Sequence, residues 1–180
     1  MGYLVELDTG EYGCVDADES VFPVDITEHD WRTPYPAVQA EPVFEWERGE
    51  SRVRPDVFWY PQMGDWVCGE RAYRTLKECA GQDLHTIARG TLDGEPVFLV
   101  QVTTVLDVVD MEASIVERYP SYEVLAFPAF WRHAEEEIAG RLFRVPKAMT
   151  MLFCGERVKA ALEAAGIKGL RFVPADWSEG

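Results

Sequence analysis

Two stretches of the chain share one hydrophobic pattern, and each predicts a strand, a turn and an amphipathic helix. The tetrapeptide Cys-Gly-Glu-Arg occurs at residues 68–71 and again at 154–157, each time after an apolar stretch. Beyond it, apolar residues recur at i, i+4 and i+7, which is one face of a helix. The matching positions are Ala72, Leu76 and Cys79 in the first copy and Val158, Leu162 and Ala165 in the second. We therefore expect helices over about 70–80 and 156–165, with Gly81 and Gly166 behind them.

Other segments predict strands. Val43–Glu47 alternates apolar and acidic residues, as a half-exposed strand does. The longest apolar run, Val97–Leu106, is expected to pair with Leu84–Ala88 through a turn at Leu92–Glu95. Further strands are expected at Tyr3–Leu7, Tyr122–Phe127, Ile138–Phe143 and Leu170–Val173, and Val57–Tyr60 is expected to be a buried or interface run that ends at Pro61. Residues 11–42 contain four prolines and no clear period, which predicts loops with short extended pieces.

These elements predict an α+β fold in which two main helices pack on a mostly antiparallel sheet, with the strand–turn–helix unit duplicated. No linker rich in proline, glycine or serine divides the chain. We therefore expect a single domain over residues 1–180, made of an acidic N-terminal part (1–54) and a duplicated αβ core (55–180).

Composition supports a folded domain. Of the 180 residues 47% are hydrophobic, and six are tryptophan, enough for a core rather than a disordered chain. No apolar run is long enough to cross a membrane, and the N-terminus lacks the pattern of a signal peptide. The four cysteines show no C-x-x-C spacing. Reduced, buried thiols in a cytoplasmic protein are the expectation.

Charge is distributed unevenly. The net charge is −15, and residues 1–50 hold 13 acidic residues against only Arg32 and Arg48. Such a field repels nucleic acid and anionic membranes and attracts a basic protein partner. An acidic surface that only maintains solubility is the simpler explanation of the charge alone. For a partner surface, the best candidates are acidic residues interleaved with aromatic ones. They are Asp16, Asp18, Glu19, Phe44, Glu45, Trp46 and Glu47.

Catalytic chemistry has few candidates. Asp107 and Asp110 follow a predicted strand, and His133 precedes three glutamates; together they would suit a small hydrolase or transferase. No metal-binding histidine motif, phosphate-binding glycine loop or nucleophile elbow accompanies them. We therefore expect no enzyme activity, no cofactor and no metal. An adaptor domain within a larger assembly remains an alternative.

The repeated motif resembles the bacterial polymorphic-toxin immunity proteins of the Imm-eleven type. Three regions carry the resemblance, which covers about residues 55–175. They are Val67–Ala72 with Leu76; Gln101 and Val102 through Asp107–Asp110 with Ser114; and Phe143–Pro146 through Phe153, Glu156, Arg157, Leu162, Gly166 and Gly169–Pro174. The family usually has serine or aspartate before the Glu-Arg pair, where this chain has Gly69 and Gly155.

The resemblance implies a cytoplasmic, non-enzymatic protein that neutralises a toxin made by the same or a neighbouring cell. It identifies no catalytic residue and does not identify the toxin. Many toxin domains attack nucleic acids or nucleotides and so have basic clefts. An acidic inhibitor would complement such a cleft. The expected partner is therefore a cognate toxin domain, with neither nucleic acid nor membrane bound.

Overall fold

The computed structural model describes residues 1–18, 21–22, 30, 32–36, 38, 40–61, 65–120 and 123–179. Strands dominate it, with 49% strand and 22% helix. In chain order the elements are β1 (Gly2–Leu7), α1 (Thr9–Tyr12), β2 (Cys14–Ala17), β3 (Val43–Glu47), β4 (Val57–Tyr60), β5 (Asp65–Gly69), α2 (Glu70–Ala80), β6 (Leu84–Leu92), β7 (Glu95–Val102), β8 (Val109–Arg118), β9 (Glu123–Trp131), α3 (Glu135–Ile138), β10 (Leu142–Val145), β11 (Ala148–Gly155), α4 (Glu156–Ala164), β12 (Leu170–Pro174) and β13 (Asp176–Ser178). Short 3₁₀ turns at Gly81–Asp83 and Arg132–Ala134 precede β6 and α3.

The predicted fold class, α+β with two main helices on one mostly antiparallel sheet, is wrong. Six strands close into a barrel in the order β2-β3-β6-β7-β5-β4, and two more sheets have the orders β10-β11-β1-β12 and β13-β9-β8. Barrel closure depends on parallel pairings of β2 with β4 and of β3 with β6. These pairings join segments far apart in the chain, so no local pattern reports them. The described residues form four α-helices; α1 and α3 are single turns, too short to show a helical period.

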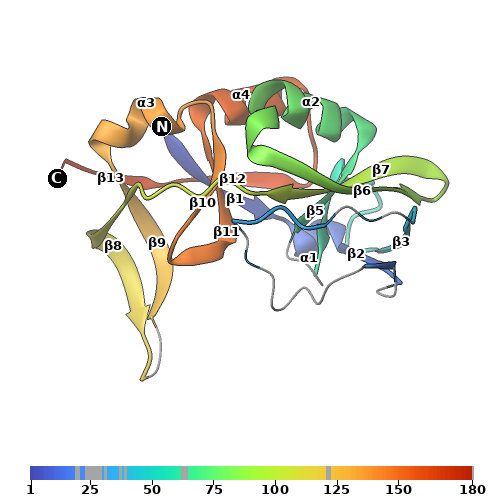
Figure 1. Ribbon diagram of the computed structural model, residues 1–180, viewed down its shortest axis with the longest axis horizontal. Helices are drawn as coiled ribbons and strands as arrows, with labels where there is room; N and C mark the ends of the chain where they lie inside the picture. Colours follow the sequence, from blue (N-terminus) through green and yellow to red (C-terminus); the bar gives the residue numbers. More distant parts are fainter. Residues whose placement is uncertain are drawn as a thin grey trace.

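Both copies of the repeated motif form a strand, a turn and a helix. Strand β5 leads through Gly69 into α2, and β11 leads through Gly155 into α4. The helices lie side by side on one side of the sheets (Figure 1). Their apolar faces meet in a common core, in which Leu76 and Leu162 are buried. The repeat thus forms a two-helix layer over strands of the barrel and of the four-stranded sheet.

Most of the expected strands form. The hairpin of β6 and β7 turns at Asp93 and Gly94, both with positive φ, which is the backbone that a two-residue hairpin turn requires. The strand expected at Ile138–Phe143 is wrong at its start, because Ile138 ends α3 and β10 begins only at Leu142. The expected Val97–Leu106 strand ends early, at Val102.

A buried ionic cluster joins the barrel to the four-stranded sheet. Asp83 is fully buried, and its carboxylate accepts hydrogen bonds from the Arg141 guanidinium (Nη2 to Oδ1, 2.6 Å), the Leu142 amide and the Thr104 hydroxyl. The Asp83 carboxylate raises the pKa of Arg141. Buried charges with complete hydrogen bonding fix geometry more than they add stability. The cluster therefore fixes how β10 and β11 lie relative to the barrel.

The β8–β9 hairpin extends away from the body of the molecule, on the side opposite the helices (Figure 1). Its base packs into a second core around Phe130, Phe143 and Phe153, which β1, α3, β10 and β11 share. A third core fills the barrel. Among the described residues, no helix is long and apolar enough to span a membrane.

Candidate functional site

An acidic strip lies on the outside of the barrel, where β2 and β3 pair. We define it as Asp16, Asp18, Glu45 and Glu47, all of which are exposed. The antiparallel register sets Asp16 directly opposite Glu45. Like charges in this position destabilise a sheet.

Three acids of the strip, Asp16, Asp18 and Glu45, line a surface hollow of about 400 Å³. Its lining residues are Asp16, Ala17, Asp18, Val43 and Glu45. Val43 is among the most exposed large apolar side chains of the described chain, at 66%. An apolar side chain beside carboxylates suits a basic side chain, whose charged end can meet the acids while its methylene stem covers the valine. Glu19, also expected here, lies outside the described residues.

The two aromatic candidates on β3 point inward. Phe44 is only 2% exposed and packs edge-on against Tyr60 inside the barrel. Trp46 is half-buried, and its Nε1 donates to the Tyr12 carbonyl at 2.7 Å. Alternation along β3 was predicted correctly, but its apolar face forms the barrel interior. Phe44 and Trp46 therefore support the strip from within, and we assign them no direct contact with a partner.

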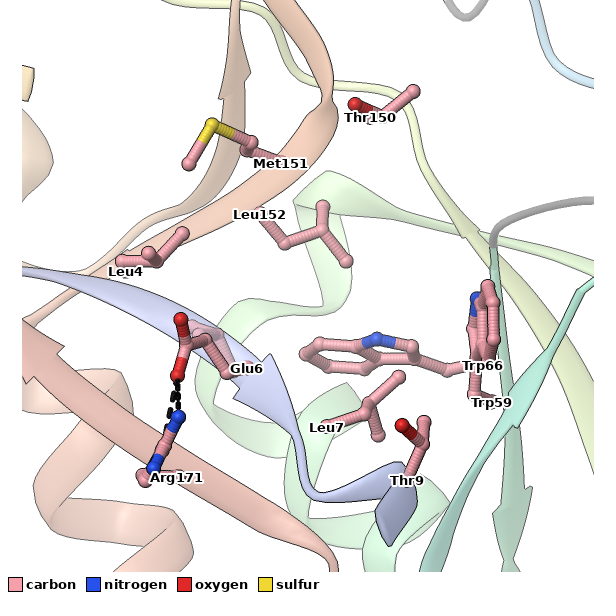
Figure 2. Close-up of a pocket in the computed structure, with 11 residues that line it drawn as sticks. Leu4, Glu6, Leu7, Thr9, Trp59, Trp66, Thr150, Met151, Leu152 and Arg171 are labelled. Carbon is pink, nitrogen blue, oxygen red and sulfur yellow. Dashed lines mark hydrogen bonds and ion pairs between the residues drawn. The ribbon is translucent and has the colours of Figure 1, made fainter. Parts of the chain in front are cut away.

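A second pocket opens between the barrel and the four-stranded sheet (Figure 2). We call it the Trp66 pocket; its volume is about 440 Å³. Residues from β1, α1, β4, β5, β11 and β12 line it, mostly with apolar side chains. They are Leu4, Val5, Glu6, Leu7, Thr9, Trp59, Trp66, Thr150, Met151, Leu152 and Arg171. Pockets of this size and composition are typical of ligand and side-chain binding sites.

One charged pair and one indole give this pocket its polar character. Arg171 of β12 lies opposite Glu6 of β1, and its Nε donates to the Glu6 carboxylate at 2.9 Å. The carboxylate raises the pKa of Arg171. Trp66 is 2% exposed, and its ring extends between Leu7 and Leu152 (Figure 2).

The acidic strip and the rim of the Trp66 pocket lie on neighbouring strands of the barrel, β3, β2 and β4. Cys14 lies opposite Glu47 on one side and is bridged to Trp59 on the other. Its thiol donates to the Glu47 carboxylate at 3.4 Å, and burial together with that carboxylate raises the pKa of the thiol. Trp59, at the pocket rim, is 36% exposed. Two strand spacings, about 10 Å, therefore separate Trp59 from the acidic strip.

The alternative catalytic residues have separate surroundings. Asp110 is buried, and its carboxylate accepts hydrogen bonds from the Ser178 hydroxyl (2.5 Å) and two backbone amides of its own loop. These bonds, the Ser178 bond first, lower its pKa, so Asp110 serves as a structural cap. Asp107 is exposed, and His133 is exposed and stacked on Trp131. In the part of the chain that the structure describes, no three histidine, cysteine or acidic residues form a group that could hold a metal ion.

The cysteines of the repeat are core residues. Cys68 and Cys154 are fully buried, and burial raises the pKa of both thiols far above its usual value. A thiol that stays protonated is a poor nucleophile. The prediction that they are small buried hydrophobes is confirmed.

Sequence reasoning missed the Trp66 pocket. Trp59 lies in an aromatic run that suggests burial or an interface, and Trp66 precedes the repeated motif. The lining residues come from six elements, and only the packing of the barrel against β1 and β11 brings them together.

The model of the Imm11 immunity protein family matches residues 6–176. The chain therefore belongs to the Imm11 immunity protein family. A search of curated proteins finds no match to the chain.

Proposed function

We propose that this protein binds the toxin domain of a polymorphic toxin system in the cytoplasm and neutralises it by covering a basic active cleft with its acidic strip. The protein acts by occlusion and not by catalysis. Family membership supports the immunity role. The observation that carries the proposed surface is the opposed Asp16–Glu45 pair beside the hollow.

Electrostatics explains how such a strip would act. Carboxylates clustered on one face raise the local concentration of a basic partner and increase its association rate. They also disfavour acidic partners, which gives specificity. A toxin cleft that binds phosphates carries the complementary charge. The strip would contact the same basic groups that the toxin uses to bind its substrate. Binding of the strip would therefore block the substrate and inhibit the toxin.

The first experiment pairs this protein with the toxin domain encoded by the adjacent upstream gene. Co-expression should restore growth of cells that make the toxin, and co-purification should recover a complex. Stopped-flow association should then slow as salt is added. The double variant Asp16→Lys with Glu45→Lys should lower the association rate about tenfold or more at low salt and flatten its salt dependence.

A matched control carries the same change of charge elsewhere. Glu78 on α2 and Glu136 on α3 are exposed, and Glu78→Lys with Glu136→Lys should leave the association rate within about twofold. An equal loss in both double variants would show that only net charge matters and would remove the acidic strip from the proposal. Failure to bind or to rescue would overturn the immunity role with this toxin.

A further inference from the structure

We infer that Gln101 is a positioning residue for the acidic strip. Together with His85 it binds the backbone of residues 33–35. This anchor fixes the segment that leads into β3, and so keeps Glu45 opposite Asp16. The anchor itself is independent of any partner, whereas its role in toxin binding rests on the proposed function.

The buried amide of Gln101 takes the place of a strand partner for this backbone. Gln101 lies on β7 and is only 1% exposed. Its Oε1 accepts a hydrogen bond from the Tyr35 amide at 2.8 Å, and its Nε2 donates to the Thr33 carbonyl at 3.2 Å. A buried polar side chain costs free energy unless it is hydrogen-bonded. The Gln101 amide therefore favours the fold in which the backbone of residues 33–35 supplies both its donor and its acceptor.

His85 completes the anchor from the neighbouring strand β6. It lies directly opposite Gln101 in the β6–β7 register. Its Nε2 is 2.8 Å from the Tyr35 carbonyl oxygen, and because a carbonyl only accepts, the imidazole N–H is the donor. Tyr35 is itself only 1% exposed and belongs to the core that fills the barrel. The barrel therefore holds the amide, the carbonyl and the ring of Tyr35.

Described residues between this anchor and β3 also bond to β6, in the same order along both segments. The Val38 amide donates to the Ile87 carbonyl at 3.0 Å, and the Thr91 amide donates to the Pro42 carbonyl at 3.0 Å. The parallel pairing of β3 with β6 begins directly after these bonds, at Val43. The anchor is thus the first of a series of contacts with β6 that ends in β3.

The two strands of the acidic strip have short attachments to the rest of the barrel. The register joins β2 to β4 at Cys14 and Trp59. It joins β3 to β6 at two successive residue pairs, beginning with Val43 and Thr91. By contrast, β6 and β7 pair from end to end. Segments with few such pairings open at a lower free energy than the core of a fold, so loss of the anchor at residues 33–35 should release β2 and β3 first.

Hydrogen exchange measured by mass spectrometry tests the anchor in the free protein. Gln101→Met keeps the length of the side chain and removes both of its hydrogen bonds to residues 33–35. Exchange in peptides that cover β2 and β3 should rise about tenfold or more. Exchange in peptides from β10 and β11 should stay within about twofold of the parent. An equal rise in all peptides, or no rise in β2 and β3, would overturn the inference.

Ser114→Ala is the matched control, because the Ser114 hydroxyl also joins two backbone groups. It accepts a hydrogen bond from the Ala129 amide at 2.8 Å and donates to the Asp110 carbonyl at 2.5 Å. These groups belong to the β8–β9 hairpin. The variant should raise exchange in β8 and β9 and leave β2 and β3 unchanged. If β2 and β3 respond to it as they do to Gln101→Met, their exchange reports general stability and the inference is wrong.

His85 tests the same anchor at a half-buried position, and decides the inference if Gln101→Met does not fold. His85→Leu removes the bond to the Tyr35 carbonyl and should raise exchange in β2 and β3 about threefold or more. His85→Gln keeps an N–H that can donate to this carbonyl, and should restore most of the protection. Unchanged exchange in His85→Leu would contradict the anchor.

Toxin binding separates this inference from the proposed function. Association of Gln101→Met with the toxin domain should slow about threefold or more, because fewer molecules hold the strip in its binding form. Its salt dependence should persist, because the acids remain, and Ser114→Ala should associate within about twofold of the parent. Faster exchange in β2 and β3 with unchanged association would rule out the positioning role and leave the proposed function in place. If the parent does not bind the toxin domain, the proposed function and the role in binding fall together, while the exchange data still decide the anchor.

Discussion

In the β5–α2 unit the strand belongs to the closed barrel, whereas in the β11–α4 unit the equivalent strand lies between β10 and β1 of an open sheet. The two units share the Cys-Gly-Glu-Arg turn and a buried leucine at the equivalent position of the helix, Leu76 in α2 and Leu162 in α4. Their turns nevertheless have different neighbours. A Cβ atom on Gly155 would lie 1.9 Å from the Ile138 carbonyl oxygen, while on Gly69 it would lie 3.6 Å from the Asp56 carbonyl oxygen.

This difference shows that one sequence motif can serve two structural needs. At Gly69 the glycine is only a tolerated helix N-cap. At Gly155 it lets the turn pass close to the end of α3. The acidic strip and most of the Trp66 pocket lie on strands outside the repeat. The duplicated unit therefore provides the scaffold, and the segments that were not duplicated provide the candidate binding surface.

The largest expected effects test the feature that the units share. Leu76 and Leu162 occupy equivalent buried positions in the common core. Leu76→Ala and Leu162→Ala should each lower the free energy of unfolding by about 3 kcal/mol, because each leaves a cavity. Urea unfolding measures both losses. A loss below about 1 kcal/mol in one of them would mean that the helices do not contribute alike.

The next prediction tests the difference between the two turns at the glycine of the second unit. Gly155→Ser should lower the free energy of unfolding by about 2–3 kcal/mol, because the new Cβ overlaps the backbone of α3 and the neighbouring chain must shift. Thermal and urea unfolding report this loss. A neutral Gly155→Ser variant would show that α3 can move away at little cost.

The glutamates in the first turns of α2 and α4 differ in their partners, and a test of this difference has a smaller expected effect on stability. Glu156 accepts a hydrogen bond from the Tyr3 hydroxyl at 2.5 Å, whereas Glu70 pairs with the exposed Arg74 on its own helix. Tyr3→Phe should cost about 1 kcal/mol. Glu70→Gln, the control, should cost at most about 0.5 kcal/mol.

The same contact predicts a pH dependence. Burial, and then the bond to Glu156, raises the pKa of Tyr3 to about 12 from its ordinary value of 10.0. A raised folded-state pKa means that the protonated phenol stabilises the fold. Its contribution should be complete below about pH 10 and disappear as the pH approaches 12. Unfolding of the parent protein and Tyr3→Phe across pH 8–12 should therefore converge at the alkaline end, and a constant difference would contradict this assignment.

The smallest effect comes from the other glycine. Gly69→Ser should raise the free energy of unfolding by a few tenths of a kcal/mol, since serine caps a helix slightly better than glycine. The extended backbone of Gly69 (φ −62°, ψ 163°) suits serine, and no neighbour obstructs its Cβ. Paired thermal melts of Gly69→Ser and Gly155→Ser compare the two turns directly. A loss at both positions would show that the units are more alike than their contacts indicate.

Local features of the fold were predictable because local chemistry determines them. The apolar spacing of α2 and α4, the alternation along β3 and the turn at Asp93 and Gly94 all depend on neighbouring residues. The strand boundary at Leu142 was missed because Ile138 continues the apolar run although it ends a helix. The candidate site was only partly predictable. Its acids were identified, but Phe44 faces inward, and the opposition of Asp16 to Glu45 depends on a strand register.

The sequence by itself determined the two longer helices, several of the strands, the family of the chain and the acidic character of its N-terminal part. Only the tertiary structure decided that six strands close into a barrel, that Asp16 faces Glu45, and that Trp59 and Trp66 border one pocket. The physical reason is the separation along the chain between the residues that interact. Turn and helix preferences act between residues a few positions apart, whereas parallel strand pairing and pocket formation join residues that are distant in the chain and adjacent only after packing.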